Sequence, residues 1–128
     1  MIVVDTSALM AIVMKEASAD SCSDCLAFAD AVLISAGTLM EALIVSRGRD
    51  RQKQMEELLV AVAPQVIALT EALARRAANA YETWGKGFHR AALNFGDCFA
   101  YALAKVSREP LLFKGHDFTH TDIASALK

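Results

Sequence analysis

The sequence predicts an α/β fold in which two layers of helices enclose a short parallel sheet. Two observations lead to this class. Short apolar runs rich in β-branched residues alternate along the chain with longer segments that have the apolar spacing of helices. Connections of that length imply right-handed crossovers, so the strands should be parallel and covered on both faces. We expect the 128 residues (1–128) to form a single domain around one sheet.

Four short apolar runs are expected as buried strands. They cover residues 2–4, 31–35, 65–69 and 111–113. The third run follows Pro64 and the fourth follows Pro110. Because proline is excluded from helix interiors, both positions are suitable boundaries between a helix and a strand.

The segments between these runs are expected as helices. Thr70 is typical of a residue that caps a helix start, whereas Gly48, Pro64 and Gly85 mark helix ends. The expected helices cover residues 6–16, 18–29, 38–47, 50–63, 70–84 and 97–107. Beyond residue 113 the chain is a polar turn, with room for one more short element.

The composition is that of a compact protein, with 55% hydrophobic and 22% charged residues. The net charge of −2 is not that of a protein coated with nucleic acid, so such contacts must come from local basic patches. The charge-free stretches are too short to span a membrane and the N-terminus lacks a basic signal region, so we expect a cytoplasmic location without membrane contact. Three cysteines, an odd number, argue against a disulfide scaffold.

Five acidic residues fall where the carboxyl ends of parallel strands should converge. These acids are Asp5, Glu41, Asp97, Asp117 and Asp122. In open α/β sheets, sites form beyond this edge. Singly, Asp5 and Asp97 have a simpler explanation as helix caps, whereas Glu41 lies among apolar neighbours that suggest a largely buried carboxylate. As a converging set, the five acids predict a site.

Several carboxylates in one small space need a counter-charge, and few basic residues lie at these positions. Carboxylate oxygens without histidine or cysteine partners favour Mg²⁺ or Mn²⁺ over zinc. Such ions serve phosphodiester cleavage, because they lower the pKa of a water molecule and shield the phosphate charge. The acids therefore indicate Mg²⁺, with Mn²⁺ as the second candidate.

Over its whole length, the chain resembles the PIN-domain ribonucleases, and in particular the VapC toxins of type II bacterial toxin–antitoxin pairs. The resemblance rests on the segments "VVDTSAL", "GDCFAYALAK" and "PLLFKGHDFTHTDI", together with Glu41. It implies a PIN-like three-layer α/β/α sandwich. It also implies that Asp5 and Asp97 bind the metal, and that Glu41 and Asp117 complete a catalytic quartet.

The resemblance also implies further roles and partners. Asp122 falls where some members carry another acid near the metals, and Thr6 or Ser7 would orient Asp5 or a water at the metal. The implied activity is Mg²⁺-dependent endonucleolytic hydrolysis of RNA by an activated water. The implied partners are the RNA substrate, a cognate antitoxin laid over the acidic cleft, and a second copy of the chain in a homodimer.

RNA binding needs local positive charge, which two patches provide. The first patch consists of Arg47, Arg49, Arg51 and Lys53. The second patch consists of Lys86, His89 and Arg90, within "GKGFHR". An ordinary solvated helix face explains the first patch at least as well as RNA binding does. The glycines of the second patch, and its position just before Asp97, favour RNA binding. Lys114 lies beside the acids and is a third candidate for a phosphate contact.

Two other functions compete with a ribonuclease. A receiver-like signalling domain has a similar length, and Lys114 matches its late lysine. However, Asp5 has no acidic neighbour, and Thr70 stands where the phosphate-accepting aspartate would follow the middle strand. The other alternative is a PIN-fold module that binds RNA or antitoxin with weak catalysis or none. The intact set of acids argues against it.

Overall fold

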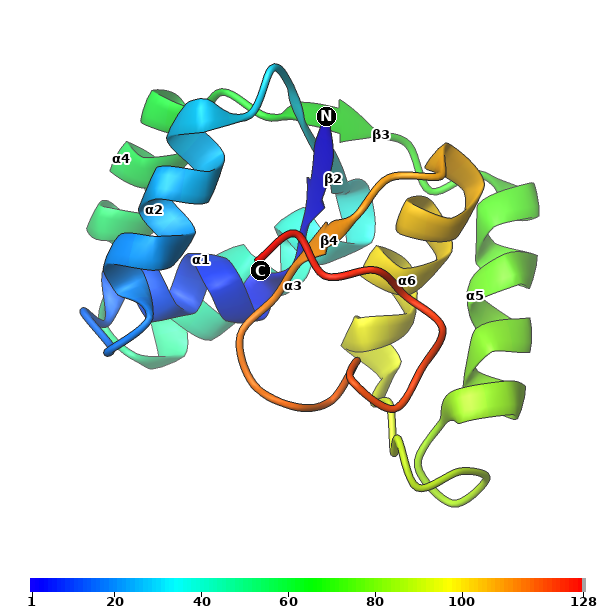
Figure 1. The fold of residues 1–128 in the computed structure, drawn as a ribbon. Coiled ribbons are helices and arrows are strands. Elements are labelled where there is room, and N and C mark those ends of the chain that lie inside the picture. The colour runs from blue at the N-terminus through cyan, green and yellow to red at the C-terminus, as the bar shows by residue number, and fades with distance from the viewer. Residues whose placement is uncertain (128) are drawn as a thin grey trace.

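The computed structural model describes residues 1–127 and places a parallel sheet between two groups of helices (Figure 1). The strands are β1 (Ile2–Val4), β2 (Val32–Ser35), β3 (Gln65–Ile67) and β4 (Leu111–Leu112). Their order in the sheet is β3-β2-β1-β4, and each neighbouring pair is parallel. The predicted α/β sandwich is confirmed.

The helices also correspond to the predicted segments. They are α1 (Thr6–Val13), α2 (Ala19–Phe28), α3 (Ala36–Gly48), α4 (Gln52–Val62), α5 (Glu71–Trp84) and α6 (Phe95–Ser107). Helix α1 ends earlier than expected, and Lys15 just beyond it has a left-handed backbone with φ of 54°. Helix α3 begins earlier because Ser35 Oγ accepts a hydrogen bond from the Gly37 N–H at 3.2 Å. Within residues 1–127, none of these helices is long and apolar enough to cross a membrane.

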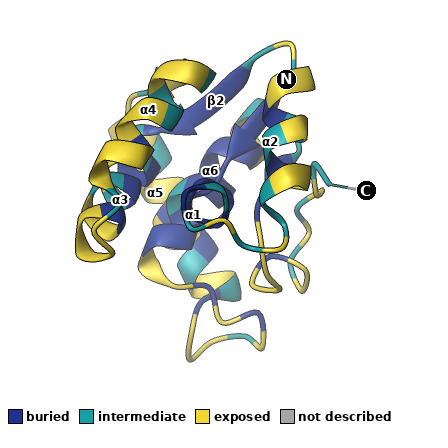
Figure 2. Cartoon of the chain, turned by 90° about the vertical axis from the view of Figure 1, so that its left-hand side faces the viewer, coloured by how far each residue is buried: buried dark blue, intermediate teal, exposed yellow. Residues whose placement is uncertain are grey.

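The sheet separates two apolar cores, because successive strand residues point to opposite faces. Val3 packs with residues of α5 and α6 on one face. Val4 packs with residues of α1, α2 and α4 on the other. Figure 2 shows the buried strands at the centre, with the exposed sides of α4 and α2 turned outward. Helices therefore cover both faces, as the crossover rule requires.

Helix α3 packs against both α1 and α6, which brings residues from distant parts of the chain together. The contact with α6 is close: a Cβ at Gly37 would lie 2.6 Å from the Phe99 ring. A Cβ at Gly96 would likewise overlap the carboxyl group of Glu41. Glycine at position 37 leaves room for the Phe99 ring, and glycine at position 96 leaves room for the Glu41 carboxyl group in its present position. The close packing places Glu41 against the first turn of α6.

The C-terminal segment returns to the edge of the sheet beside β4. The Leu111 N–H donates to the Ala124 carbonyl, and the Ala126 N–H donates to the Leu111 carbonyl, both at 2.9 Å. A single parallel bridge pairs Leu111 with Ser125. This bridge is the additional short element expected in the tail. It covers the otherwise open edge of β4.

Candidate active site

Asp5 lies directly after β1 and is the N-cap residue of α1. Its Oδ2 accepts hydrogen bonds from the Ser7 N–H at 3.0 Å and from Ser7 Oγ at 2.6 Å. Its Oδ1 is buried without a hydrogen-bond partner, and the residue is only 2% exposed. Burial raises the pKa of Asp5 to about 6, opposed by the Ser7 hydrogen bonds and reinforced by the charge of Glu41. An unpaired buried carboxylate oxygen is the feature expected where a cation binds.

Asp97 is both a capping residue and a member of the acidic cluster. The Asp97 N–H donates to Asn94 Oδ1 at 2.8 Å, and the Asn94 N–H donates to Asp97 Oδ2 at 3.0 Å. These two bonds form a capping box at the start of α6. Burial, together with the charges of Asp5, Asp117 and Glu41, raises the pKa of Asp97 to about 7, opposed by the hydrogen bond from the Asn94 N–H. The structure thus brings the four acids of the predicted quartet close enough to repel one another.

Glu41 reaches this cluster from α3 and is held there by a hydroxyl group. Thr6 Oγ1 donates to Glu41 Oε1 at 2.6 Å. Glu41 is of intermediate burial, so it is partly enclosed as expected, although its neighbour Met40 is 53% exposed. The apolar residues around Glu41 in the sequence lie partly on an open face of α3. The apolar side chains on this open face of α3 are therefore not explained by burial in the core.

Asp117 is exposed and belongs to the segment after β4. Contacts on either side hold this segment near the cluster. The Lys114 N–H donates to Ser7 Oγ at 3.0 Å, and Phe118 is buried with its ring 5.1 Å from that of Phe113. The backbone around Asp117 is therefore fixed, although its carboxylate remains accessible to solvent.

Asp122 has different partners from the other four acids. Its Oδ1 accepts a hydrogen bond from the Tyr101 hydroxyl at 2.5 Å, and its Oδ2 pairs with Lys105 Nζ at 2.9 Å. Tyr101 in turn accepts a hydrogen bond from Trp84 Nε1 at 2.9 Å. Both carboxylate oxygens are engaged, and Asp122 is not among the charges that raise the pKa of Asp97. These contacts fasten the C-terminal segment to α6, and they favour this structural role for Asp122 over that of a further metal ligand.

The basic candidates differ in how freely they can contact a substrate. Lys86 and Arg90 are exposed in the loop between α5 and α6, whereas His89 is half-buried with its ring edge-on to Trp84 at 4.8 Å. Lys114 forms an ion pair with Glu16 at 2.9 Å. Because exposed ion pairs contribute about 1 kcal/mol or less, a phosphate can compete for Lys114.

The patch Arg47, Arg49, Arg51 and Lys53 spans the end of α3 and the start of α4. Lys53 lies 4.0 Å from Glu57, one turn further along α4, and both side chains are largely exposed. Such a pair is typical of a solvated helix face. These contacts favour the solvated-face interpretation of the first patch.

The charge balance of the site fits a divalent cation. Within residues 1–127, no lysine or arginine lies within 4.0 Å of a carboxylate of the four clustered acids. In the same residues, no three histidine, cysteine or acidic side chains already form a group that would hold an ion. An open set of oxygens of this kind suits a hard divalent cation that keeps several of its waters and is bound by one or two carboxylates.

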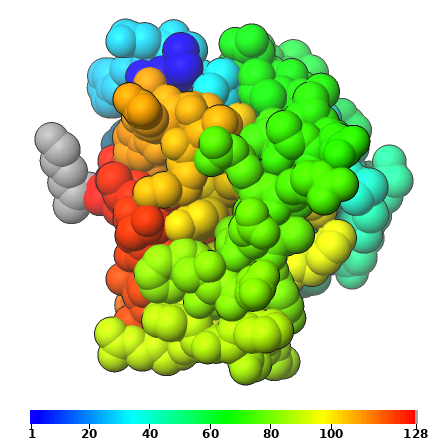
Figure 3. Space-filling model, turned by 90° about the vertical axis from the view of Figure 1, so that its right-hand side faces the viewer, coloured from blue at the N-terminus to red at the C-terminus, as the bar shows by residue number. Residues whose placement is uncertain are grey.

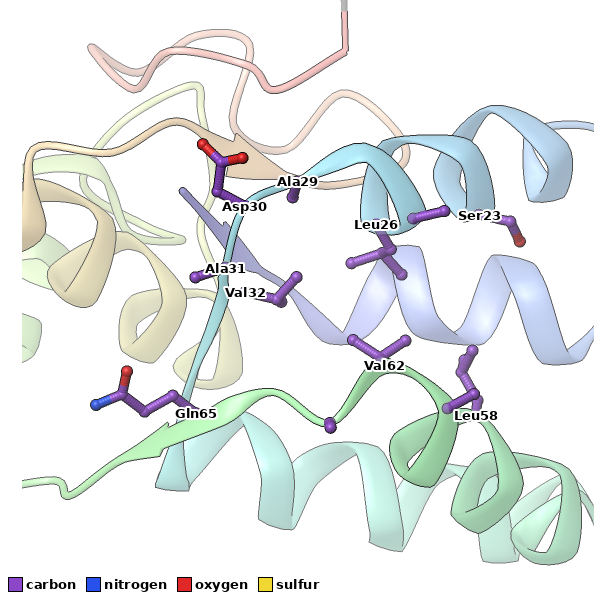
Figure 4. Close-up of a pocket in the computed structure, with 12 residues that line it drawn as sticks. Ser23, Leu26, Ala29, Asp30, Ala31, Val32, Leu58, Val62 and Gln65 are labelled. Carbon is purple, nitrogen blue, oxygen red and sulfur yellow. The ribbon is translucent and has the colours of Figure 1, made fainter.

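A large cavity lies at the opposite edge of the sheet and has different chemistry. It encloses about 540 Å³ between α2 and α4, near the amino ends of β2 and β3 (Figure 4). Leu26, Val32, Leu58 and Val62 line it together with the polar residues Ser23, Asp30 and Gln65. The cluster of acids, by contrast, lies beyond the carboxyl ends of the strands. This cavity is therefore separate from the candidate active site.

Two residues that position the acids were not predicted from the sequence. Asn94 forms the capping box with Asp97, and its signal was the three-residue spacing of asparagine and aspartate before an apolar run. Gly96 admits the Glu41 carboxyl group, which comes from a helix more than fifty residues earlier in the chain. No local pattern indicates such a long-range contact.

The fold and the acids define the class of the protein. The family model for the PIN domain matches residues 2–124. Ribonuclease VapC30 of Mycobacterium tuberculosis is 43% identical over 126 residues, which cover 96% of this chain and 96% of the relative. Ribonuclease VapC28 of the same organism is 43% identical over 129 residues, or 98% and 97% of the two chains. The chain belongs to the VapC ribonucleases of the PIN-domain family.

Solved structures show the same fold. The crystal structure of Mycobacterium tuberculosis VapC20, a toxin that cleaves the sarcin–ricin loop, has a TM-score of 0.79 at 18% identity and covers 100% of both chains. A chain from a toxin–antitoxin complex of Klebsiella pneumoniae has a TM-score of 0.71 at 18% identity, over 95% of this chain and 93% of the other. The PIN fold is confirmed, and the receiver-like alternative is excluded.

Proposed function

We propose that the chain is the toxin of a type II toxin–antitoxin pair and cleaves RNA endonucleolytically with Mg²⁺ bound by Asp5 and Asp97. The observation that carries this proposal is the buried Asp5 Oδ1, which has no hydrogen-bond donor. It belongs to a cluster in which burial, with the charges of the neighbouring acids, raises the pKa of Asp97 to about 7. A divalent cation would coordinate the unpaired oxygen and would reduce the mutual repulsion of the acids. Family membership in the VapC ribonucleases supports the same activity.

Each residue of the cluster has a distinct part in this proposal. Asp5 and Asp97 hold the ion, and Glu41 and Asp117 complete the acidic rim. Ser7 fixes Asp5 through two hydrogen bonds, and Thr6 fixes Glu41 through one. When bound, a divalent ion supplies Lewis acidity: it lowers the pKa of a water and shields the phosphate charge. Mn²⁺ satisfies the same donor set.

We further propose that the acidic cleft is closed by a cognate antitoxin. Support comes from the similar fold in a Klebsiella pneumoniae toxin–antitoxin complex and from the VapC relatives. We propose a single PIN domain over 1–128 and a cytoplasmic location, where RNA and antitoxin are both available.

We also propose a homodimer, supported by an exposed apolar face on α3, α5 and α6. Met40, Leu69, Phe95 and Phe99 line a hollow of about 580 Å³ on this face. Met40 and Phe95 are themselves largely exposed. A contiguous apolar hollow of this kind is typical of a surface that another protein chain covers. Analytical ultracentrifugation of wild type and Phe95→Asp tests the dimer, which the substitution should dissociate.

The test of the activity compares purified wild type with Asp5→Asn and Asp97→Asn on a defined single-stranded RNA. Wild type should cleave with Mg²⁺ and lose cleavage in EDTA, and both variants should be inactive while keeping the wild-type circular dichroism spectrum. Asp24→Asn is the matched control, since Asp24 is an exposed acid on α2. Undiminished cleavage by both site variants would refute the assignment of the acids.

The alternative function, a binding module with little catalysis, gives a different result. It predicts that wild type binds RNA or antitoxin without Mg²⁺-dependent cleavage, and that its expression leaves growth unaffected. The proposed toxin should slow growth when expressed alone, and co-expression of the antitoxin should restore growth. Sequencing RNA 5′ ends after brief induction of wild type and of Asp97→Asn would identify the cleaved sites.

A further inference from the structure

The loop between α5 and α6, residues 85–94, projects from the molecule at the end where α6 begins (Figure 1). In the space-filling view it forms the lower rim of the face that α5 covers (Figure 3). Its two ends are joined, because the Lys86 N–H donates to the Leu93 carbonyl at 2.9 Å and the Leu93 N–H donates to the Trp84 carbonyl at 3.0 Å. Leu93 is fully buried. The loop is therefore anchored to the core at its base.

The tip of the loop is also ordered. The N–H groups of Phe88 and His89 both donate to the Gly85 carbonyl, at 2.9 and 3.0 Å. The His89 ring accepts a hydrogen bond from the Ala91 N–H at 2.9 Å and packs edge-on against Trp84. His89 thus supports the loop from inside. His89 was expected as an RNA contact, but its half-buried ring packs inside the loop, so other residues occupy the outward positions.

Phe88 occupies an outward position and is 64% exposed. Its closest aromatic neighbour is Tyr81, at a centroid distance of 5.9 Å and an interplanar angle of 75°. Burying a phenylalanine side chain would stabilise the fold by about 1.5–3 kcal/mol, and this loop forgoes most of that gain. An ordered loop that holds an aromatic ring in solvent is suited to a ligand with a flat face.

The charges beside Phe88 indicate the kind of ligand. Lys86 and Arg90 lie two residues before and after it, and both are exposed. Within residues 1–127, neither cation has an acidic partner within 4.0 Å. An aromatic ring between free cations is the arrangement that binds single-stranded nucleic acid: bases stack on the ring and the cations contact phosphates.

We infer that Phe88 stacks on an unpaired base of the RNA substrate, with Lys86 and Arg90 on the flanking phosphates. The loop leads directly into Asn94 and Asp97, so the stacked base would lie near the phosphate that is cleaved. This inference rests on the proposed ribonuclease activity and adds a subsite that selects looped or single-stranded RNA over duplex. A paired base has both of its faces covered by neighbours and cannot stack on the ring.

The experiment separates binding from cleavage. Binding is measured with Asp97→Asn protein and single-stranded RNA that carries the fluorescent base 2-aminopurine at successive positions, in Mg²⁺. Cleavage kinetics are measured with otherwise wild-type protein. Phe88 is changed to alanine, to leucine, which is apolar without a ring, and to tyrosine, which keeps the ring. Phe28→Ala is the matched control, because Phe28 is 84% exposed on α2 and has no such cations two residues away.

We expect Phe88→Ala and Phe88→Leu to raise KM by about 5- to 100-fold, the range of one lost stacking contact, while kcat stays close to wild type. The quenching of 2-aminopurine at one position should disappear in both. Phe88→Tyr should preserve both signals, and Phe28→Ala should change neither. A Phe88→Leu variant that binds RNA like wild type would overturn the inference.

Two further outcomes distinguish the possible failures. If Phe88→Ala binds RNA normally but loses affinity for the antitoxin, the loop is a protein-docking surface and the inference is wrong. If wild type cleaves no RNA with Mg²⁺ or Mn²⁺, the proposed activity fails. In that case, position-specific quenching by Asp97→Asn protein that depends on Phe88 would still establish the stacking subsite.

Discussion

The Ser7 hydroxyl donates a hydrogen bond to Asp5 Oδ2 at 2.6 Å and accepts one from the Lys114 N–H at 3.0 Å. Ser7 therefore joins the acid after β1 to the segment after β4 that carries Asp117. The Ser7 N–H donates to the same Asp5 oxygen, which fixes the carboxylate and leaves Oδ1 without a hydrogen-bond partner. The preceding hydroxyl, Thr6 Oγ1, holds Glu41 in the same way. Two consecutive residues thus orient acids from two separate elements.

Ser7→Ala should weaken Mg²⁺ binding or cleavage by about 10- to 100-fold, the usual cost of removing a group that orients a metal ligand. Isothermal titration with Mg²⁺ and cleavage rates at several Mg²⁺ concentrations measure the effect. Ser21→Ala is the control, since Ser21 is exposed on α2. Unchanged Mg²⁺ affinity and rate in Ser7→Ala would show that Asp5 needs no support from the hydroxyl.

Gly96→Ala should abolish most of the cleavage, because the added Cβ would overlap the Glu41 carboxyl group and displace either Glu41 or α6. Gly48→Ala provides the comparison, since a Cβ there meets nothing within 4 Å. In that variant, activity should persist and the free energy of unfolding should change by about 1 kcal/mol or less. Both variants are compared by RNA cleavage and by urea denaturation. Full activity of Gly96→Ala would mean that Glu41 moves without consequence.

The stability of the metal-free protein should fall as pH rises toward neutrality. In the folded state the pKa of Asp5 is about 6 and that of Asp97 about 7, whereas the usual value is 3.8. Between these values the folded state binds more protons than the unfolded chain. The stability that these two groups contribute is therefore fully present below about pH 3.8 and is lost as pH rises through 6 and 7. At about 1.4 kcal/mol for each pKa unit, the two shifts set an upper limit of about 7 kcal/mol, because the charges of the two acids also raise each other's pKa.

Urea denaturation in EDTA at several pH values measures this dependence. In Asp5→Asn/Asp97→Asn, the part of the pH dependence due to these groups should vanish. Added Mg²⁺ should stabilise wild type more strongly at higher pH, because it binds the ionised carboxylates. A wild-type protein in EDTA with the same pH profile as the double variant would contradict the prediction.

Asp122→Ala should reduce stability while preserving cleavage. The substitution removes the acceptor for Tyr101 and the partner of Lys105, at a cost of about 1 kcal/mol because the pair is half-exposed. Burial, together with the hydrogen bond to Asp122, raises the pKa of Tyr101 to about 12, and the substitution should lower it. Spectroscopic titration of tyrosine detects this change. A loss of cleavage as large as that of Asp97→Asn would instead support a role for Asp122 at the metal site.

Much of the fold was predictable because its signals are local. The apolar strand runs, the cap at Thr70 and the stop at Pro64 each depend on a few adjacent residues. The acids after β1 and before β4 were predictable for a topological reason, since parallel strands bring their carboxyl ends to one edge. Asp97 illustrates the local and the topological signal together. It belongs to the capping box of α6, as the simpler interpretation held, and it interacts with the other acids.

The sequence by itself determined the fold class, the order of the elements and the four acids that cluster, because these follow from apolar spacing, chain direction and family motifs. Only the tertiary structure decided which oxygens are free. It leaves Asp5 Oδ1 unpaired, gives both oxygens of Asp122 to Tyr101 and Lys105, and turns Phe88 toward solvent. These outcomes depend on contacts between residues far apart in the chain. Hydrogen-bond partners and exposure are set by packing in three dimensions, which no local pattern specifies.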